Sequence, residues 1–327
     1  MNTKHAKSTC CQAKVRNFGR KRRQCGACKR TWSIRPRRRG RKPRRPSQEL
    51  VQQVISKGYT LRLLGKRHRH IRLPNLRHWF RRSLLWSLRT PLTLSMPDGP
   101  LVLLADGLHF RFNGKPWTLY LMALRPCPGS TAFFLDPVLF SGNESAAMWE
   151  LVIESIPSDL LQRIQALVVD DLPGMGLLAK RKKWILQLCQ FHLFLRLRAH
   201  DRPLHYARKG GNVRQDIDTL VRSALKAPSD FALYHHLSRI ETIVYSPATT
   251  RRIRGILRHF TLTAKSYRAH LIHPDLQLPN TNNTLESMGN LIRTVLRRHH
   301  SATRPTSLLL WATAFIRSKR TLICNGK

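Results

Sequence analysis

Three carboxylates occupy positions from which the chain could bind divalent cations. Asp106 follows the apolar run LVLLA, and Asp170 follows the apolar run LVV. Glu286 lies much later, within PNTNNTLESMG, at the start of a predicted basic helix. Two Asp and one Glu offer the hard oxygen ligands that Mg²⁺ prefers, and they leave positions for water and phosphate. Two such ions would activate an attacking oxygen and stabilise the leaving one in phosphoryl transfer.

Each carboxylate also has a purely structural interpretation. An Asp after an apolar strand is often a turn residue, and Asp136, which is followed by Pro137, is explained in this way. Asn283 and Glu286 match a capping box, with Asn at the N-cap and Glu three residues later. The pattern leaves the structural and the chemical interpretations of Glu286 open.

The charge balance predicts a polyanionic partner. The 327 residues include 59 Lys and Arg but only 17 Asp and Glu, which gives a formal net charge of +42. Nucleic acid is the expected partner, and a membrane surface is the alternative. No apolar run reaches the roughly 18 residues needed to span a bilayer, and the N-terminus lacks a signal-peptide pattern. We therefore expect an intracellular protein that has no membrane partner.

Clustered arginines are the predicted DNA contacts. The run RPRRRGRKPRRP at 35–46 is expected to follow the DNA backbone, and a solvated linker without contacts is the alternative. Two predicted helices, one after Pro74 and one after Asn283, each carry a basic side. The predicted DNA-binding residues are Arg37, Arg38, Arg39, Arg41, Arg44, Arg45, Arg77, Arg81, Arg293 and Arg297.

Cysteines near the N-terminus predict a zinc site. Cys25 and Cys28 form a CxxC turn of the kind that presents two thiolates to one metal ion. The second pair of a zinc ribbon is irregular, because only the adjacent Cys10 and Cys11 are available and neighbouring cysteines seldom share one ion. The predicted ligands are therefore Cys25, Cys28, Cys11 and His5. A decayed ribbon whose basic surface still binds DNA is the alternative.

Hydrophobic patterns place the acidic residues on an α/β core. Strands are predicted at 101–112, 117–125, 131–140, 164–171 and 184–192, with a helix at 144–156. The order β-β-β-α-β-α-β is the layout of the RNase H-like fold, a mixed five-stranded sheet flanked by helices. Its first and fourth strands lie side by side, so that Asp106 and Asp170 would end within a few Å of each other. Like charges at that distance need a cation to neutralise them.

Four parts of the chain are predicted. They are a zinc-ribbon-like segment at 1–34, a basic linker at 35–46, a helix-turn-helix domain at 47–97, and a catalytic domain at 98–320 with a helical insertion at about 196–275. The helix-turn-helix prediction depends on three short helical patterns, the third of them strongly basic. An ordinary three-helix bundle with a solvated basic face is the alternative.

Taken together, the motifs resemble the DDE transposases of bacterial insertion sequences, specifically the Mutator-like group. The family pattern has an Asp-Gly first acid, here Asp106, and a second Asp at the end of a strand, here Asp170. A Cys-x-x-His follows, here Cys189 and His192, and then an Asn-rich stretch that contains the catalytic Glu286. The resemblance covers about residues 100–320.

The resemblance implies a function and a setting. Asp106, Asp170 and Glu286 would bind two Mg²⁺ or Mn²⁺ ions and catalyse DNA strand cleavage and strand transfer. The N-terminal parts would bind the terminal inverted repeats of the element. The protein would act as a dimer or higher oligomer on double-stranded DNA, associated with the nucleoid in a bacterial cytoplasm.

Four further residues are expected to support the site. The second family acid is usually followed by Gly, whereas here Asp171 follows Asp170, so that Asp171 is the alternative second ligand. Cys189 and His192 either bind a metal or DNA near the site, or are buried neighbours without a function. Asn290 shares the predicted side of the late helix with Glu286.

Two other functions remain open on the sequence. The chain could be a non-catalytic DNA-binding protein derived from a transposase, or it could be an RNase H-like nuclease. The presence of all three acids favours an enzyme over the first. The N-terminal cysteine and helix-turn-helix patterns favour double-stranded DNA over the substrates of the second.

Overall fold

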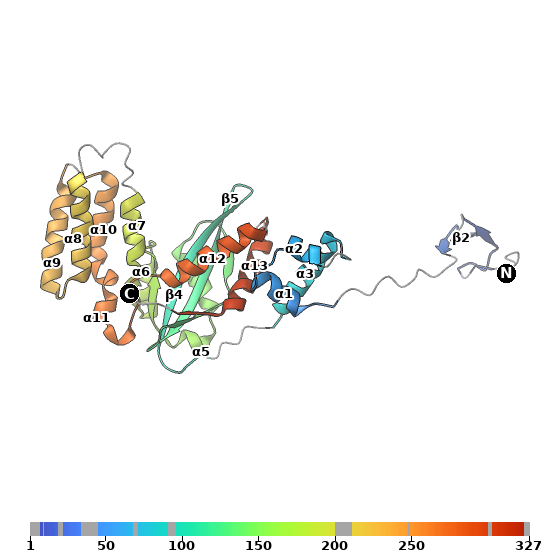
Figure 1. The fold of residues 1–327 in the computed structure, drawn as a ribbon, viewed down its shortest axis with the longest axis horizontal. Coiled ribbons are helices and arrows are strands. Elements are labelled where there is room, and N and C mark those ends of the chain that lie inside the picture. The colour runs from blue at the N-terminus through green and yellow to red at the C-terminus, as the bar shows by residue number, and fades with distance from the viewer. Residues whose placement is uncertain are drawn as a thin grey trace. The chain divides into compact units, whose positions relative to one another are not determined.

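The structure, a computed structural model, describes residues 7–8, 10–18, 22–33, 45–67, 71–90, 96–199, 211–247, 249–299 and 303–323 (Figure 1). The chain divides into two compact units, Met1–Pro46 and Ser47–Lys327. Within the described residues, no helix is both long enough and apolar enough to cross a membrane.

The first unit is built on a small antiparallel sheet. Its strands are β1 (Val15–Asn17), β2 (Arg22–Cys25) and β3 (Thr31–Ser33), in the order β1-β2-β3. Cys25 is the last residue of β2, and Cys28 lies in the turn that leads to β3. The sheet therefore presents both thiols of the CxxC turn at one end.

The second unit contains a mixed seven-stranded sheet. The strands are β4 (Leu101–Phe112), β5 (Lys115–Pro126), β6 (Thr131–Phe134), β7 (Val138–Ser141), β8 (Ile164–Val169), β9 (Ile185–Leu188) and β10 (Thr321–Ile323). The order is β10-β6-β5-β4-β8-β9, and β7 also pairs with β5. The pairs β4–β8 and β8–β9 are parallel, and the other pairs are antiparallel. The predicted mixed α/β sheet is thus confirmed, and so is the predicted adjacency of its first and fourth strands.

The sheet has seven strands, not the predicted five. The predicted strand at 131–140 is broken at Asp136-Pro137, because proline has no backbone N–H to donate to a strand pair. Its two halves, β6 and β7, pair with different parts of β5. The short strand β10 near the C-terminus adds a further edge. The predicted last strand at 184–192 ends at Leu188, and a helix begins at Gln190.

Helices cover both faces of the sheet and extend beyond it (Figure 1). They are α1 (Gln48–Ile55), α2 (Leu61–Arg67), α3 (Leu73–Ser87), α4 (Ala146–Glu154), α5 (Ser158–Leu161), α6 (Met175–Lys182), α7 (Gln190–Ala199), α8 (Gly211–Lys226), α9 (Asp230–Tyr245), α10 (Arg251–Tyr267), α11 (Ala269–Ile272), the 3₁₀ helix η2 (Pro274–Leu276), α12 (Asn283–His299) and α13 (Pro305–Lys319).

Alternation along β4 separates two hydrophobic cores. Successive side chains of a strand point to opposite faces. Leu103 and Ala105 pack with α4 and α6–α10, whereas Val102 and Leu104 pack with α1–α3, α12 and α13. Asp106 therefore lies on the face of the sheet that α12 covers.

Helices α1–α3 share the second of these cores with the end of the chain. The rings of Phe80 in α3 and Trp311 in α13 lie 5.2 Å apart between centroids. Leu50 and Leu76 belong to the same cluster of buried side chains as Val102 and Leu285. The three helices predicted at 47–88 are therefore packed into the unit that contains the sheet.

Candidate functional sites

Strand register brings Asp106 and Asp170 to the same level of the sheet. The last parallel pair between β4 and β8 joins Leu104 and Val168. Asp106 lies two residues beyond Leu104, and Asp170 lies two residues beyond Val168. The expectation that Asp106 ends its strand is wrong, because β4 continues to Phe112 as a hairpin with β5. What ends near Asp106 is the pairing with β8.

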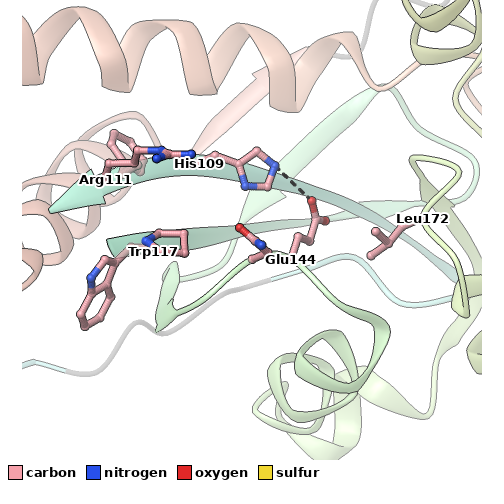
Figure 2. A pocket seen from close by; sticks show the side chains of 8 residues that line it. His109, Arg111, Trp117, Glu144 and Leu172 are labelled. Atoms are coloured by element: carbon pink, nitrogen blue, oxygen red, sulfur yellow. Dashed lines mark ion pairs between the residues drawn. The ribbon is translucent and has the colours of Figure 1, made fainter. Parts of the chain in front are cut away.

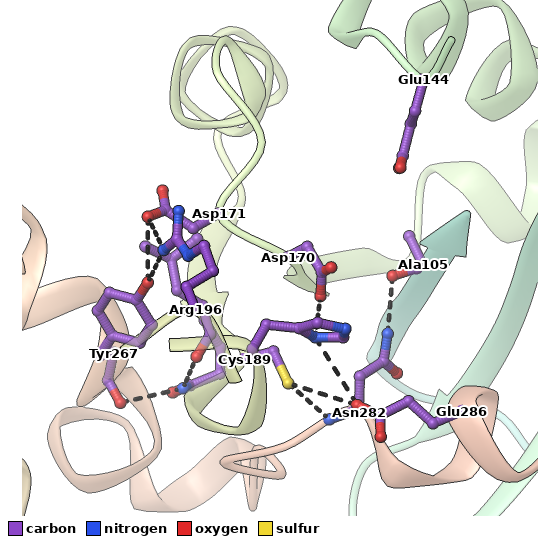
Figure 3. A network of polar contacts seen from close by, with 12 residues as sticks. Ala105, Glu144, Asp170, Asp171, Cys189, Arg196, Tyr267, Asn282 and Glu286 are labelled. Carbon is purple, nitrogen blue, oxygen red and sulfur yellow. Dashed lines mark hydrogen bonds and ion pairs between the residues drawn. The ribbon is translucent and has the colours of Figure 1, made fainter. Parts of the chain in front are cut away.

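One imidazole joins two of the predicted metal ligands (Figure 3). Nδ1 of His192 forms an ion pair with Oδ1 of Asp170, and the same nitrogen lies 3.7 Å from Oε1 of Glu286. Burial lowers the pKa of His192, but the contacts with Asp170 and Cys189 outweigh burial and raise the pKa to about 11. In its charged form, His192 therefore offsets part of the negative charge of the neighbouring acids.

Asp106 is buried beside this pair and has no partner of its own. Its exposed fraction is 7%, and it makes no hydrogen bond or ion pair with another described residue. Burial, together with the negative charges of Asp170, Glu144 and Glu286, raises its pKa to about 7, although His192 opposes this effect. The three acids predicted from the sequence thus lie near enough to affect the ionisation of Asp106, whereas the described ligand atoms within 4.8 Å of one another here are those of Asp170, Cys189 and His192.

Asn282 anchors α12 next to Asp106. Its side-chain amide donates to the carbonyl oxygen of Ala105 over 2.7 Å, and its backbone N–H donates to Sγ of Cys189 over 3.2 Å. Sγ of Cys189 also lies 4.0 Å from Oε1 of Glu286. Sequence reasoning missed Asn282, because an Asn in an Asn-rich stretch gives no signal that distinguishes it from its neighbours.

The predicted capping box does not describe the start of α12. The helix begins at Asn283, so this residue is helical and does not stand outside the helix as an N-cap. The carboxylate of Glu286 contacts His192 and Cys189 instead. Gly289 then lets α12 approach β4, because a Cβ at this position would lie 2.7 Å from Cδ2 of Leu108.

Asp171 is occupied by a separate network (Figure 3). Its carboxylate accepts hydrogen bonds from Nη2 of Arg196 at 2.5 Å and from the Tyr267 hydroxyl at 3.1 Å. It also contacts Nε2 of His259 at 2.7 Å. Burial alone would raise the pKa of Asp171, but the hydrogen bonds from Arg196 and His259 lower it. Of the two neighbouring acids, it is Asp170 that contacts His192 beside Glu286.

A fourth carboxylate, that of Glu144, lies next to Gly107, the residue that follows Asp106. It precedes α4 and accepts a hydrogen bond from Nε1 of Trp149 over 2.7 Å. Its charge acts on Asp106, and burial raises the pKa of Glu144 itself. Sequence reasoning did not select it, since it follows no strand-end aspartate pattern.

A pocket of about 530 Å³ opens beside Glu144 (Figure 2). It is lined by His109, Phe110, Arg111, Pro116, Trp117, Asn143, Glu144 and Leu172. Nε2 of His109 lies 3.5 Å from Oε2 of Glu144. The pocket thus combines the guanidinium of Arg111 and the aromatic ring of Trp117 with the carboxylate of Glu144.

The predicted DNA-binding residues fall into two groups. Arg77 and Arg81 are exposed on α3, and Arg293 and Arg297 are exposed on α12. Arg45 is exposed in the first unit, whereas residues 37–44, and with them five of the predicted arginines, lie outside the described residues. Asn290 is exposed on α12, one turn after Glu286.

All four N-terminal cysteines gather in one cluster. The sulfur atoms of Cys10, Cys11, Cys25 and Cys28 lie within 4.8 Å of one another. The expectation that only one of the adjacent cysteines takes part therefore differs from the structure. Gln12 adopts a left-handed conformation with φ 52°, and the chain turns back there toward β2. The predicted ligand His5 lies outside the described residues.

The two clusters differ in the metal they suit. Four thiolates form a common tetrahedral zinc set, so the N-terminal cluster could bind zinc. Asp170, Cys189 and His192 also lie close enough to share a metal ion. This second group offers one oxygen, one sulfur and one nitrogen atom, a more mixed ligand set than the four thiols.

No model of a known protein family matches the chain, and no curated protein matches it.

Proposed function

We propose that the protein is a metal-dependent DDE transposase that cuts DNA at the ends of an insertion sequence and joins those ends to target DNA. The observation that carries the proposal is the convergence of Asp106, Asp170 and Glu286 in a chain whose net charge is +42. Acids are repelled by DNA phosphates unless a cation lies between them.

The strand order supports an RNase H-like core. A β4–β5 hairpin is followed by β6 and β7 on its outer side, and β8 and β9 extend the other side in parallel. This arrangement agrees with the fold that the sequence resemblance implies. Helices α7–α10 would be the helical insertion, and α1–α3 would be the helix-turn-helix part.

The acidic residues fit a pair of divalent ions. Asp106 is buried and lacks a hydrogen-bond partner among the described residues, and its ionised form is opposed by three neighbouring acids. Asp106, Asp170 and Glu286 would hold the ions. When bound, Mg²⁺ or Mn²⁺ activates the attacking oxygen and stabilises the leaving one. His192 and Asn282 keep Asp170 and the start of α12 in place.

The proposed reaction is a pair of phosphoryl transfers. A water oxygen attacks the scissile phosphorus, and the P–O3′ bond breaks. The O3′ atom keeps the bonding electron pair and takes up a proton, so the products are a 3′-hydroxyl and a 5′-phosphate. The 3′-hydroxyl oxygen then attacks a phosphorus of the target DNA. A new bond forms between this oxygen and the target phosphorus while the P–O3′ bond of the target strand breaks. The proton lost by the attacking hydroxyl balances the one taken up by the new 3′-hydroxyl of the target.

Basic surfaces of the second unit would hold the DNA. Arg293 and Arg297 continue along α12 from Glu286, so phosphates bound there would lie in line with the acidic site. Arg77 and Arg81 would contact the terminal repeats from α3. Each phosphate neutralised in this way releases counterions, so binding should weaken as the salt concentration rises. We expect a dimer or higher oligomer on paired ends.

A strand-cleavage assay tests the proposal. The substrate is the DNA that flanks the coding sequence, with its inverted repeats, in the presence of Mg²⁺. Glu286→Gln should reduce cleavage to the level seen without protein, because it removes a metal ligand but keeps the size of the side chain. Glu241→Gln, on the exposed side of α9, is the matched control and should cut like wild type.

Three outcomes would contradict the proposal. Wild-type cleavage by Glu286→Gln would show that the assigned acid is wrong. Tight DNA binding without cleavage at any metal concentration would point to a non-catalytic DNA-binding protein. Preference for an RNA–DNA hybrid over duplex DNA would point to a nuclease.

A further inference from the structure

We propose that Glu144 is a fourth carboxylate ligand of the same metal site, and that residue 107 is glycine because Glu144 fills the space beside it. The inference rests on the proposed function and adds a residue that no sequence motif selected. It also gives a physical reason for the Asp106-Gly107 pair.

The space beside Gly107 is taken by the carboxylate of Glu144. A Cβ built on Gly107 would lie 2.6 Å from Cδ and 2.6 Å from Oε2 of Glu144, and 2.8 Å from Oε1. Real Cβ atoms do not approach other atoms that closely, so any side chain at 107 would displace the carboxylate. Asp106 points to one face of β4 and Gly107 opens the other, and Glu144 reaches the strand from that second face.

Two contacts fix the orientation of Glu144. Nε1 of Trp149 donates to Oε1 over 2.7 Å, and Nε2 of His109 lies 3.5 Å from Oε2. Trp149 is fully buried and packs edge-on against Tyr120, with 4.8 Å between ring centroids. Each oxygen has one such contact and keeps further lone pairs for another ligand. The carboxylate is therefore held in advance of metal binding.

The carboxylate lies within electrostatic reach of the other acids. The negative charges of Asp170 and Glu286 act on Asp106 together with that of Glu144, and the charge of Asp170 also acts on Glu144. Figure 3 shows Glu144 pointing toward the region between Asp170 and Ala105. The pairing of β4 with β8 ends at Leu104, and beyond it the carbonyl oxygen of Ala105 accepts a hydrogen bond from the side chain of Asn282.

The hydrogen bond from Trp149 would not require an acid, because a glutamine would accept it equally well. The negative charge of Glu144 is therefore needed only for its contact with the exposed His109 or for a cation. Asp106 supplies independent support for a bound cation, since it is 7% exposed and unpartnered among the described residues. Four carboxylates can ligate two ions, whereas three leave the second ion with few protein ligands.

Mn²⁺ binding to the full-length, zinc-loaded protein tests the inference. The binding is measured from the electron paramagnetic resonance signal of free Mn²⁺, and cleavage is measured on the same samples. Glu144→Gln keeps the acceptor for Trp149 but removes the charge, and we expect Mn²⁺ affinity to fall at least about tenfold, as for lost metal-site partners. Glu154→Gln, on the exposed side of α4, is the matched control and should bind Mn²⁺ like wild type.

Gly107→Ala provides a second variant that changes no charge. The added methyl group should push Glu144 aside and weaken Mn²⁺ binding in the same direction. If this variant fails to fold, Glu144→Gln still decides the question.

The outcomes separate this inference from the proposed function. Wild-type Mn²⁺ affinity in Glu144→Gln overturns the inference. If Glu286→Gln has lost cleavage in the same experiment, the proposed function stands without Glu144. If Glu286→Gln cuts DNA like wild type, the proposed function itself fails.

Discussion

At the scale of single residues, the site is a set of acids that repel one another. Asp106, Asp170, Glu144 and Glu286 all contribute negative charge to a partly buried region. His192 is the described cation in direct contact with two of them. This imbalance remains in the protein without metal, and it has a measurable consequence for stability.

Without divalent cations, Asp106 should make the protein less stable as the pH rises. Its pKa is about 7 in the folded state, against 3.8 as its ordinary value, because burial and neighbouring acids oppose ionisation. The folded state therefore retains a proton that the unfolded state releases, and stability falls from about pH 4 to about pH 7. Since one pKa unit equals about 1.36 kcal/mol, the ionised carboxylate costs on the order of 4 kcal/mol above pH 7.

Asp106→Asn should remove this loss. We expect the variant to be more stable than wild type at pH 8, to exceed wild type by less at pH 5, and to have no cleavage activity. Urea unfolding without added divalent cations measures the difference, and Asp98→Asn, in the exposed loop before β4, is the control. An identical pH dependence in Asp106→Asn and wild type would contradict the raised pKa.

The sequence predicted three of the four acids because two of them follow strand patterns and one belongs to a motif. Glu144 gave no such signal, since its relation to Gly107 depends on how a loop returns to the far face of the sheet. A Glu five residues before a buried Trp is informative only after the partner of the indole N–H is known. The position of an acid after a strand can therefore be predicted from the sequence, whereas a contact between a loop residue and the far face of the sheet cannot.

At the scale of elements, the helical insertion is tied to the strand end that carries the second acid. Arg196 in α7, together with His259 and Tyr267 in α10, contacts the carboxylate of Asp171. Asp170 precedes this residue and contacts His192. The two adjacent aspartates thus have different contacts. Asp170 contacts His192, whereas Asp171 contacts residues of α7 and α10.

Asp171→Asn should destabilise the protein more than Asp170→Asn. It leaves Arg196 and His259 without their shared carboxylate, and we expect a loss of about 1–2 kcal/mol after allowing for the partial exposure of both partners. Asp170→Asn loses the ion pair with His192 but relieves repulsion among the acids, so its net effect on stability should be smaller, while cleavage should be abolished. Urea unfolding and the cleavage assay together distinguish the two positions.

Tyr267→Phe is the control for this pair of variants, because it removes one hydrogen bond from Asp171 and no charge. Suppose instead that Asp171→Asn loses cleavage without a change in stability, and that Asp170→Asn still cuts DNA. Then Asp171 would be the metal ligand, and Asp170 would not.

Element types were predicted better than element ends. The apolar pattern at 131–140 gave one strand, yet Pro137 divides it, and the pattern at 184–192 continued through Cys189 into what is a helix. In both cases apolar residues continue past the end of a strand, so hydrophobicity alone does not show where the pairing stops. The end of a strand depends on which backbone groups still find partners.

At the scale of the whole molecule, two compact units carry different groups that could hold a metal ion. The first presents four thiols, and the second presents one carboxylate, one imidazole and one thiol. Sequence spacing argued against the use of both Cys10 and Cys11, because it could not show that the chain turns back at Gln12. Measuring zinc binding distinguishes a site of four cysteines from the predicted site of three cysteines and His5.

Cys10→Ser and Cys11→Ser should each abolish tight zinc binding, since all four sulfur atoms lie within 4.8 Å of one another and structural zinc takes four ligands. Zinc released by thiol modification and detected with a coloured chelator measures the content, and one ion per wild-type chain is expected. Cys127→Ser, in the second unit, is the control and should retain zinc. Full zinc content in Cys10→Ser would favour the predicted set of three cysteines and His5.

The packing of α1–α3 against α13 also affects how such proteins can change by recombination. Phe80 and Trp311 come from segments more than 200 residues apart, yet they belong to one core. A crossover between Pro46 and Ser47 exchanges the cysteine-bearing unit without separating these partners. A crossover between α3 and β4 would join α1–α3 to an α13 with which they did not evolve. The N-terminal unit can therefore be exchanged without disturbing this core, whereas α3 has to change by substitutions that its neighbours tolerate.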